Sequence, residues 1–243
     1  ALLMQDVTAA QAAEASRRQF SANVSHELRT PLTTISGYAE LLSSGMLQKP
    51  EDATEFGRKI LAESRRLLTL IEDIIRLSRL DEGVRGEVTP VDLTALIQHC
   101  VQKLTPAAQN AQVSISASGN DPVLISGDHA LLEEMLTNLL ENGIKYNHAG
   151  GYVRARAEMA DGRAVVTVAD NGVGIAPEDQ QRVFERFYRV DKSRSKQTGG
   201  TGLGLSIVKH GAQVHHAQIA MQSALGEGTT ITLTFPAQSS GKK

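Results

Sequence analysis

Two long stretches with a helical pattern of apolar residues occupy the first third of the chain. Over residues 9–46 apolar positions recur every three or four residues, which predicts one helix with a single apolar stripe: Phe20, Val24, Leu28, Pro31, Ile35, Tyr38 and Leu42. A turn containing Gly45 and Pro50 follows, and then a second helical pattern with a wider apolar face: Phe56, Ile60, Leu67, Ile71 and Ile74, with Leu61, Leu68 and Ile75 beside them. A hairpin of two such helices leaves apolar surface exposed unless it pairs with a copy of itself. The pattern therefore predicts a dimeric four-helix bundle.

The rest of the chain mixes helix-like and strand-like segments. The helical pattern stops near residues 81–83, and the charged, glycine-containing stretch to Pro90 indicates a linker. Beyond it, helical patterns cover residues 93–110, 129–146 and 202–215, and strand patterns cover residues 113–116, 123–125, 152–158, 164–169, 219–223 and 229–235. Because regular alternation of strand and crossover helix is missing, the pattern favours an α+β sandwich with helices on one face of a sheet.

Composition narrows the class of protein without naming it. The 243 residues are 41% hydrophobic and 21% charged, which is typical of a soluble globular protein and excludes wholesale disorder. A formal net charge of -2 supplies no global positive field for nucleic acid or an anionic membrane, so any anion site must be local. One cysteine, Cys100, excludes an internal disulfide and suits a reducing compartment. The start lacks Met and the end is polar, so we expect a fragment of a longer protein.

One histidine is expected to face solvent on the first helix. With the apolar stripe centred on Val24, Ile35 and Leu42, an advance of about 100° per residue places His26 almost opposite the buried face. Glu27 is its neighbour, and Thr30 lies one turn later on the same patch. Neutral imidazole is abundant at pH 7, and one ring nitrogen can attack while the other gives its proton to a carboxylate.

The segment around this histidine carries a family resemblance. Residues 20–32 read FSANVSHELRTPL, which closely resembles the H-box of the sensor histidine kinases of two-component systems, particularly the phosphate-sensing PhoR-like group. The resemblance implies that His26 is the phosphoacceptor, that Glu27 is the base that deprotonates the ring, and that Thr30 assists dephosphorylation.

A polar helix face in the second half of the chain fits a nucleotide. Asn138, Asn142 and Lys145 fall on adjacent turns of one predicted helix, so two amides and an ammonium could converge on phosphate and a hard cation. The segment resembles the family's N-box. That resemblance implies that Asn142 ligates Mg²⁺, that Asn138 supports it, and that Lys145 and Tyr146 contact the nucleotide. Gly143 stands where the family usually has Ala.

A strand ending in a carboxylate and two glycines follows. After residues 164–169 come Asp170, Gly172 and Gly174; the carboxylate can accept from an exocyclic amine, and the glycines let backbone approach a flat base. This segment resembles the G1 box of the GHKL ATP-binding fold, which implies that Asp170 reads the adenine amine.

A further segment contains basic and glycine-rich parts. Residues 184–189 read FERFYR, a basic stretch runs to residue 198, and residues 199–205 read GGTGLGL. Backbone N–H groups of such glycines can bind phosphates at the start of the following helix. These parts resemble the F-box, the mobile ATP lid and the G2 box; the implied nucleotide contacts are Arg189, Gly200, Gly202, Leu203 and Gly204. Residues 226–229 match the short G3 element, which by itself is an ordinary hairpin turn.

The motifs together imply a two-domain architecture. We expect a signalling helix from an upstream sensor at 1–19, a dimerisation and histidine phosphotransfer domain (HisKA) at 20–86, an ATP-binding domain of the Bergerat or GHKL type at 90–236, and a tail at 237–243. The resemblance implies ATP-dependent autophosphorylation of His26, transfer to an aspartate of a response regulator, phosphatase activity, a homodimer, Mg²⁺, and a cytoplasmic place in a bacterial protein anchored in the inner membrane.

Two other functions are compatible with the sequence. No GxxxxGK[ST] or GxGxxG string occurs, so neither a P-loop nor a Rossmann site is indicated. A GHKL ATPase that uses water as acceptor and a non-catalytic pseudokinase that only senses and docks partners are the alternatives.

Overall fold

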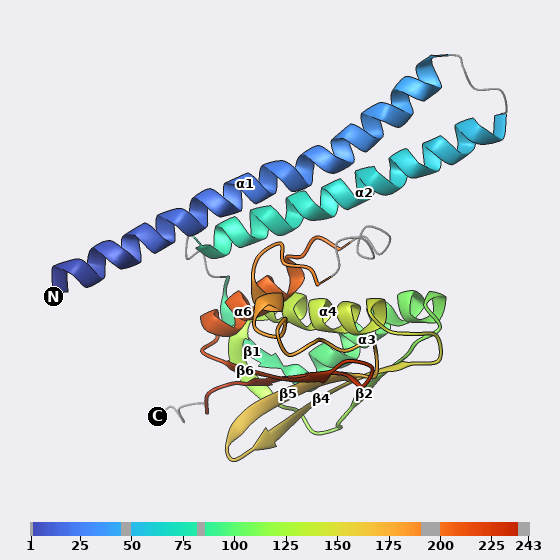
Figure 1. Ribbon diagram of the computed structural model, residues 1–243. Helices are drawn as coiled ribbons and strands as arrows, with labels where there is room; N and C mark the ends of the chain where they lie inside the picture. Colours follow the sequence, from blue (N-terminus) through green and yellow to red (C-terminus); the bar gives the residue numbers. More distant parts are fainter. Residues whose placement is uncertain (1, 45–49, 82–85, 191–199, 238–243) are drawn as a thin grey trace. The chain divides into compact units, whose positions relative to one another are not determined.

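The computed structural model describes residues 2–44, 50–81, 86–190 and 200–237, and the chain forms two compact units (Figure 1). The first unit takes residues 1–78 with 199–201, and the second takes residues 79–198 with 202–243. The predicted tail beyond residue 237 and most of the predicted ATP lid, residues 191–198, lie outside the described residues. No helix in the described ranges combines the length and apolar character needed to cross a bilayer.

The first unit is the predicted helical hairpin. Helix α1 (Leu2–Ser43) and helix α2 (Pro50–Asp81) meet through the Tyr38 and Phe56 rings, whose centroids are 5.2 Å apart. Leu70 and Leu77 are buried within α2. Large apolar side chains of the same hairpin remain exposed: Leu32, Leu41, Leu61, Leu68, Ile71 and Ile75. The hairpin therefore has an apolar surface that the single chain does not cover.

Helix α1 continues through Pro31 without interruption. A proline inside a helix lacks an N–H for the carbonyl four residues earlier and crowds that carbonyl. Two threonine hydroxyls next to it donate back to the helix, Thr30 Oγ1 to the His26 carbonyl at 3.3 Å and Thr34 Oγ1 to the Thr30 carbonyl at 3.1 Å. Such back-bonding often accompanies bends in helices, but α1 stays regular on both sides of His26.

The second unit is an α+β sandwich, as predicted. Its sheet has the strand order β2 (Ser114–Ser118), β4 (Tyr152–Ala160), β5 (Arg163–Asp170), β7 (Gly228–Thr234) and β6 (Gln218–Ala224). Helices α3 (Leu93–Asn110), α4 (His129–Lys145) and α6 (Gly204–Val214) cover one face of it (Figure 1). Alternate residues of the central strands point into the core beneath these helices: Val153, Ala155, Ala157, Ala164, Val166, Val168, Ile231 and Leu233.

One part of the expected linker is wrong. The stretch up to Pro90 was expected to be irregular, but Val88–Asp92 forms strand β1, which pairs antiparallel with β3 (Leu124–Asp128). A two-stranded ribbon consists of edges only, where a proline is tolerated. Asp92 then caps α3, accepting from the Thr94 N–H at 2.9 Å and also from the Val123 N–H at 3.2 Å. The regular structure of the second unit therefore begins before the position the sequence pattern indicated.

Candidate phosphoacceptor and nucleotide site

The His26 side chain is 77% exposed on α1, on the face that the periodicity predicts. Its Nδ1 atom lies 3.8 Å from Oε1 of Glu27, a carboxylate that is 27% exposed. This distance is too long for a hydrogen bond but places the carboxylate beside one ring nitrogen. The other nitrogen, Nε2, is left as the nucleophile, and a small adjustment of the Glu27 side chain would let it take the Nδ1 proton.

The polar face of α4 lies against the start of α6. Asn138 donates from Nδ2 to the Glu134 carbonyl at 3.0 Å, which leaves its Oδ1 atom pointing the other way. A Cβ added to Gly204, the first residue of α6, would lie 2.6 Å from that oxygen. Gly204 therefore allows the helix start and the Asn138 amide to approach closely.

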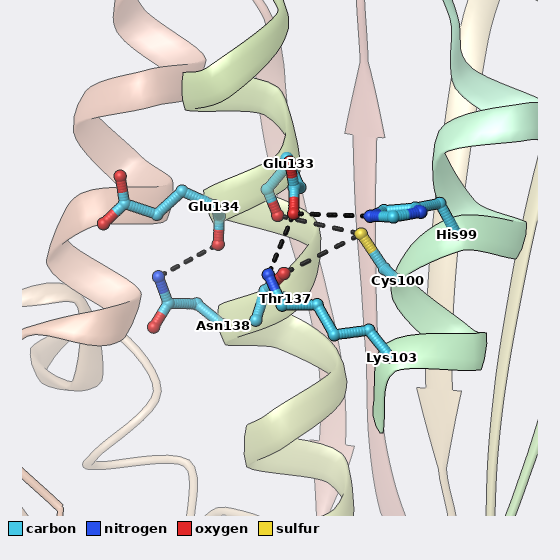
Figure 2. Close-up of polar contacts among 7 residues, drawn as sticks. All are labelled: His99, Cys100, Lys103, Glu133, Glu134, Thr137 and Asn138. Carbon is cyan, nitrogen blue, oxygen red and sulfur yellow. Dashed lines mark hydrogen bonds and ion pairs between the residues drawn. The ribbon is translucent and has the colours of Figure 1, made fainter. Parts of the chain in front are cut away.

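Figure 2 shows a polar cluster that joins α3 to α4 and is separate from the bond between Asn138 and Glu134. Lys103 donates to Glu133 at 2.9 Å, and His99 lies 3.8 Å from the same carboxylate. Cys100 is fully buried beside Thr137, and burial raises the pKa of its thiol. A buried thiol with a raised pKa is unreactive, so this cluster fastens α3 to α4.

Residues at the end of α4 meet the loop that follows β5. The Val173 N–H donates to the Tyr146 carbonyl at 3.0 Å, and a Cβ on Gly172 would come within 2.4 Å of that carbonyl. Lys145 Nζ lies 5.3 Å from the Tyr146 ring centroid. Desolvation raises the pKa of the Tyr146 phenol, and the nearby charge of Arg189 partly offsets this effect. Lys145, Tyr146 and Arg189 therefore gather beside the glycine loop.

Asp170 is held at the end of β5 by backbone donors. Its Oδ1 atom accepts from the Gly172 N–H at 2.8 Å and from the Thr229 N–H at 3.3 Å. Desolvation raises the pKa of the Asp170 carboxyl, and these two hydrogen bonds oppose the rise. A carboxylate that is oriented by backbone and poorly solvated is suited to accept from a ligand amine.

The next feature of the site is the start of α6. Leu203, its N-cap residue, is fully buried and makes no capping bond from its side chain, so side-chain caps do not occupy the first N–H groups of α6. Gly202 has φ +74°, and its carbonyl accepts from the Phe187 N–H at 2.8 Å. The F-box and the G2 box are thus joined at the two ends of the predicted lid. Gly200 groups with the first unit, and its contact with the nucleotide stays a prediction.

Asn142 follows Asn138 by one turn of α4 and is half-buried, and no hydrogen bond of its side-chain amide is found within the described ranges. An amide oxygen is a ligand that Mg²⁺ accepts. Three residues that the sequence pattern did not nominate, Thr229, Ser223 and Gln180, also lie at the site, bonded to Asp170 and its loop. The only sequence signal was the G3 match at residues 226–229, which contains Thr229 but neither Ser223 nor Gln180.

A prediction follows from the left-handed backbone of the loop. Gly174 has φ +68°, and an added Cβ would lie 1.9 Å from the Ala224 carbonyl oxygen. Gly174→Ala therefore combines the left-handed cost of about 1–2 kcal/mol with a clash that displaces the loop. We expect a lower melting temperature and loss of binding of a fluorescent ATP analogue.

Gly226→Ala is the matched control for this prediction. Gly226 also has positive φ, +80°, but an added Cβ would meet no atom within 4 Å. Gly226→Ala should lose only the stability that a left-handed alanine costs, and it should still bind the nucleotide analogue. Equal losses in both variants would mean that the loop's close contact with Ala224 does not matter for the site.

Two sets of features define the class of protein. The helical hairpin presents an exposed histidine beside a carboxylate. The α+β domain that follows it combines a carboxylate at a strand end with side-chain amides and a glycine-containing helix start. Comparison with known proteins agrees. A family model described as His Kinase A (phospho-acceptor) domain matches residues 16–83, and one described as histidine kinase-, DNA gyrase B-, and HSP90-like ATPase matches residues 127–239.

Relatives with known names support the same family. The chain is 43% identical over 224 residues to the sensor-like histidine kinase SenX3 of Mycolicibacterium smegmatis, an alignment that covers 92% of this chain and 58% of that protein. It is 39% identical over 246 residues to the phosphate regulon sensor protein PhoR of Pseudomonas aeruginosa, covering 98% and 54%. The chain therefore belongs to the sensor histidine kinases, and it spans somewhat more than half the length of these relatives.

Two solved structures resemble the fold. Full-length ShkA in complex with AMPPNP gives a TM-score of 0.64 at 30% identity, covering 88% of this chain and 45% of that one. Histidine kinase ThkA in complex with response regulator protein TrrA gives a TM-score of 0.71 at 22% identity, covering 92% and 63%. The predicted pairing of a helical hairpin with a GHKL-type ATP-binding domain is confirmed.

Proposed function

We propose that this chain is the catalytic core of a sensor histidine kinase that phosphorylates its own His26 from ATP and passes the phosphoryl group to an aspartate of a response regulator. The observation that carries the proposal is the exposed imidazole beside Glu27, on a chain whose second unit holds a nucleotide-type site around Asp170. An exposed position is what a phosphoryl carrier needs, because a nucleotide and a second protein must reach the same atom in turn.

The proposed phosphoryl transfer uses residues with separate tasks. Asp170 accepts from the base amine, and the N–H groups at the start of α6, with Lys145 and Arg189, bind the phosphates. The Nε2 atom of His26 then attacks the γ-phosphorus in line, the bond from that phosphorus to the bridging oxygen breaks, and ADP leaves with the electron pair. Glu27 takes the Nδ1 proton, so the product is a neutral phosphoramidate ring.

We also assign Mg²⁺ to this site, with Asn142 as its protein ligand and Asn138 supporting it. The fit rests on the Asn142 amide, which is half-buried and makes no side-chain bond in the described part of the chain. When bound, Mg²⁺ would neutralise charge on the phosphate oxygens.

The partners and setting are proposed on the same basis. The exposed apolar side chains of the hairpin would be covered by a second copy of this chain, giving a homodimeric four-helix bundle. A receiver domain would then dock near His26; ThkA, which shares this fold, has been solved in complex with the response regulator protein TrrA. We place the phosphotransfer domain at 20–86 and the ATP-binding domain at 90–236, on the cytoplasmic side of a longer bacterial protein anchored in the inner membrane.

Labelling by ATP tests the proposal. The purified chain with γ-labelled ATP and Mg²⁺ should acquire label that is stable in base and lost in acid, the behaviour of a phosphoramidate, and should pass it to a receiver domain. An ATPase that releases inorganic phosphate without labelled protein would point to water as the acceptor. A chain that binds no ATP at all would point to a pseudokinase.

Thr30 gives a prediction for the reverse reaction. Thr30→Ala removes a hydroxyl one turn from His26 that could position water, so we expect autophosphorylation within about twofold of wild type and clearly slower dephosphorylation of a phosphorylated receiver domain. Thr34→Ala is the matched control, because Thr34 makes the same helix back-bond one turn later. If the two variants lose phosphatase activity equally, helix bending accounts for the effect and Thr30 has no role of its own.

A further inference from the structure

A row of three polar side chains crosses neighbouring strands beside the nucleotide site. Strand register pairs Asp170 of β5 with Thr229 of β7, and Thr229 with Ser223 of β6. Residues paired directly across antiparallel strands project to the same face of a sheet. A carboxylate and two hydroxyls therefore stand in line, and Ser223 Oγ lies 2.8 Å from Thr229 Oγ1.

The Ser223 hydroxyl is saturated by this arrangement. It accepts from the Ile175 N–H at 2.8 Å and lies 2.8 Å from the Gly228 carbonyl, to which it must donate its one proton. Toward Thr229, Ser223 Oγ can then only accept, so the Thr229 hydroxyl is the donor in that pair. Because the Thr229 proton is used, Thr229 Oγ1 offers only lone pairs to a ligand.

Gln180 also links Ile175 to Ser223, through their backbone carbonyls. Its Nε2 atom donates to the Ile175 carbonyl at 3.1 Å and to the Ser223 carbonyl at 2.8 Å. Ile175 is thus held at its N–H by Ser223 and at its carbonyl by Gln180. Since Ile175 ends the glycine loop whose Gly172 N–H orients Asp170, both residues determine where the Asp170 carboxylate points.

We propose that Ser223, assisted by Gln180, is a positioning residue for recognition of the nucleotide base. It fixes the loop that orients Asp170, and it turns the Thr229 hydroxyl into an acceptor. The edge offered to the base then consists of acceptors, which suits a base that presents an amino group and rejects one that presents a carbonyl at that place. The inference rests on the proposed function, because it assumes that this site binds ATP.

Ser223→Ala tests the role of the hydroxyl. The substitution leaves the Ile175 N–H without its acceptor and frees the Thr229 hydroxyl to donate. We expect the KM for ATP in autophosphorylation to rise about tenfold, the equivalent of about 1.4 kcal/mol, with kcat within about twofold of wild type. The ratio of kcat/KM for ATP to that for GTP should fall, because a rotated Thr229 can donate to a carbonyl.

Gln180→Met is the second variant, since methionine has similar length and no donor. It should raise the KM for ATP by a few-fold with little change in the preference over GTP, because Thr229 keeps its partner. Ser116→Ala, an exposed serine on β2 of the same sheet, is the control and should leave every constant unchanged. Melting temperatures of all variants show whether the assays are run on folded protein.

A titration of wild type with a fluorescent ATP analogue separates the two proposals. If wild type binds no ATP, the proposed function fails. If wild type binds ATP and labels itself but Ser223→Ala and Gln180→Met keep the wild-type KM and nucleotide preference, the positioning role is overturned. A fall in kcat at unchanged KM would overturn it as well, because base recognition contributes to binding.

Discussion

His26→Gln should reduce the incorporation of label from γ-labelled ATP to background, while binding of a fluorescent ATP analogue stays at the wild-type level. The reason is chemical: glutamine is polar and of similar reach, but its amide nitrogen is not a nucleophile and cannot form a phosphoramidate. Since His26 is 77% exposed, we expect the free energy of unfolding to change by no more than about 0.5 kcal/mol. The measurement pairs a labelling assay with a nucleotide titration on the same preparation.

His99→Gln is the matched control for that result. His99 is also a well exposed helix histidine beside a glutamate, with its Nε2 atom 3.8 Å from Glu133, but it lies on α3. Its loss should leave labelling unchanged. Label that persists in His26→Gln, or disappears equally in His99→Gln, would remove His26 as the acceptor and with it the central step of the proposed function.

Local sequence patterns predict much of the fold. The predicted helix at residues 93–110 matches α3 to the residue, because the spacing of its apolar residues is a local signal. The exposure of His26 followed from the same angular argument. Strand β1 was missed because its pairing with β3 joins residues more than 30 positions apart, and a single sequence shows no signal for that pairing.

Only those residues of the site that lie within the recognised sequence motifs could be predicted. Asp170 was nominated from its place at a strand end, but the row of Asp170, Thr229 and Ser223 depends on register across three strands. Register is a tertiary property that a one-residue slip would destroy.

Gly143 shows the same limit of sequence reasoning. Its departure from the usual Ala was visible in the sequence, but the reason is spatial: an added Cβ would lie 3.0 Å from both methyl groups of Val153, a fully buried side chain of β4. A contact tighter than most real Cβ contacts must displace Val153, so glycine suits the close approach of α4 to the sheet.

Asp170→Asn should abolish useful ATP binding and at the same time stabilise the second unit at neutral pH. The amide oxygen can still accept from Gly172 and Thr229, but the other position becomes an NH₂ group that cannot accept from a base amine. The variant loses a hydrogen bond from the base amine to a charged acceptor, and its NH₂ group then faces that amine as a second donor. These two effects together should weaken ATP binding about 100-fold. A titration with the fluorescent ATP analogue measures this loss.

The stability gain follows from the pKa. Desolvation raises the pKa of the Asp170 carboxyl above its ordinary value of 3.8, so folding disfavours the ionised form. The carboxyl's favourable contribution is fully present below pH 3.8 and is lost as the pH rises through the raised pKa. Replacing it with a neutral amide should therefore increase the free energy of unfolding at pH 7, and the difference from wild type should shrink as the pH falls toward 4.

Denaturant unfolding at pH 7 and at pH 4 to 5 measures that difference, and Asp161→Asn is the control. Asp161 is exposed in the β4–β5 turn with φ +50°, a conformation that asparagine also adopts, so its replacement should change neither binding nor stability by much. If Asp170→Asn instead destabilised the chain at pH 7, the ionised carboxylate would be stabilising the fold. The Asp170 carboxylate would then have a structural role and would need no functional explanation. If the variant is instead more stable and no longer binds ATP, the ionised carboxylate lowers the free energy of unfolding and serves ligand binding.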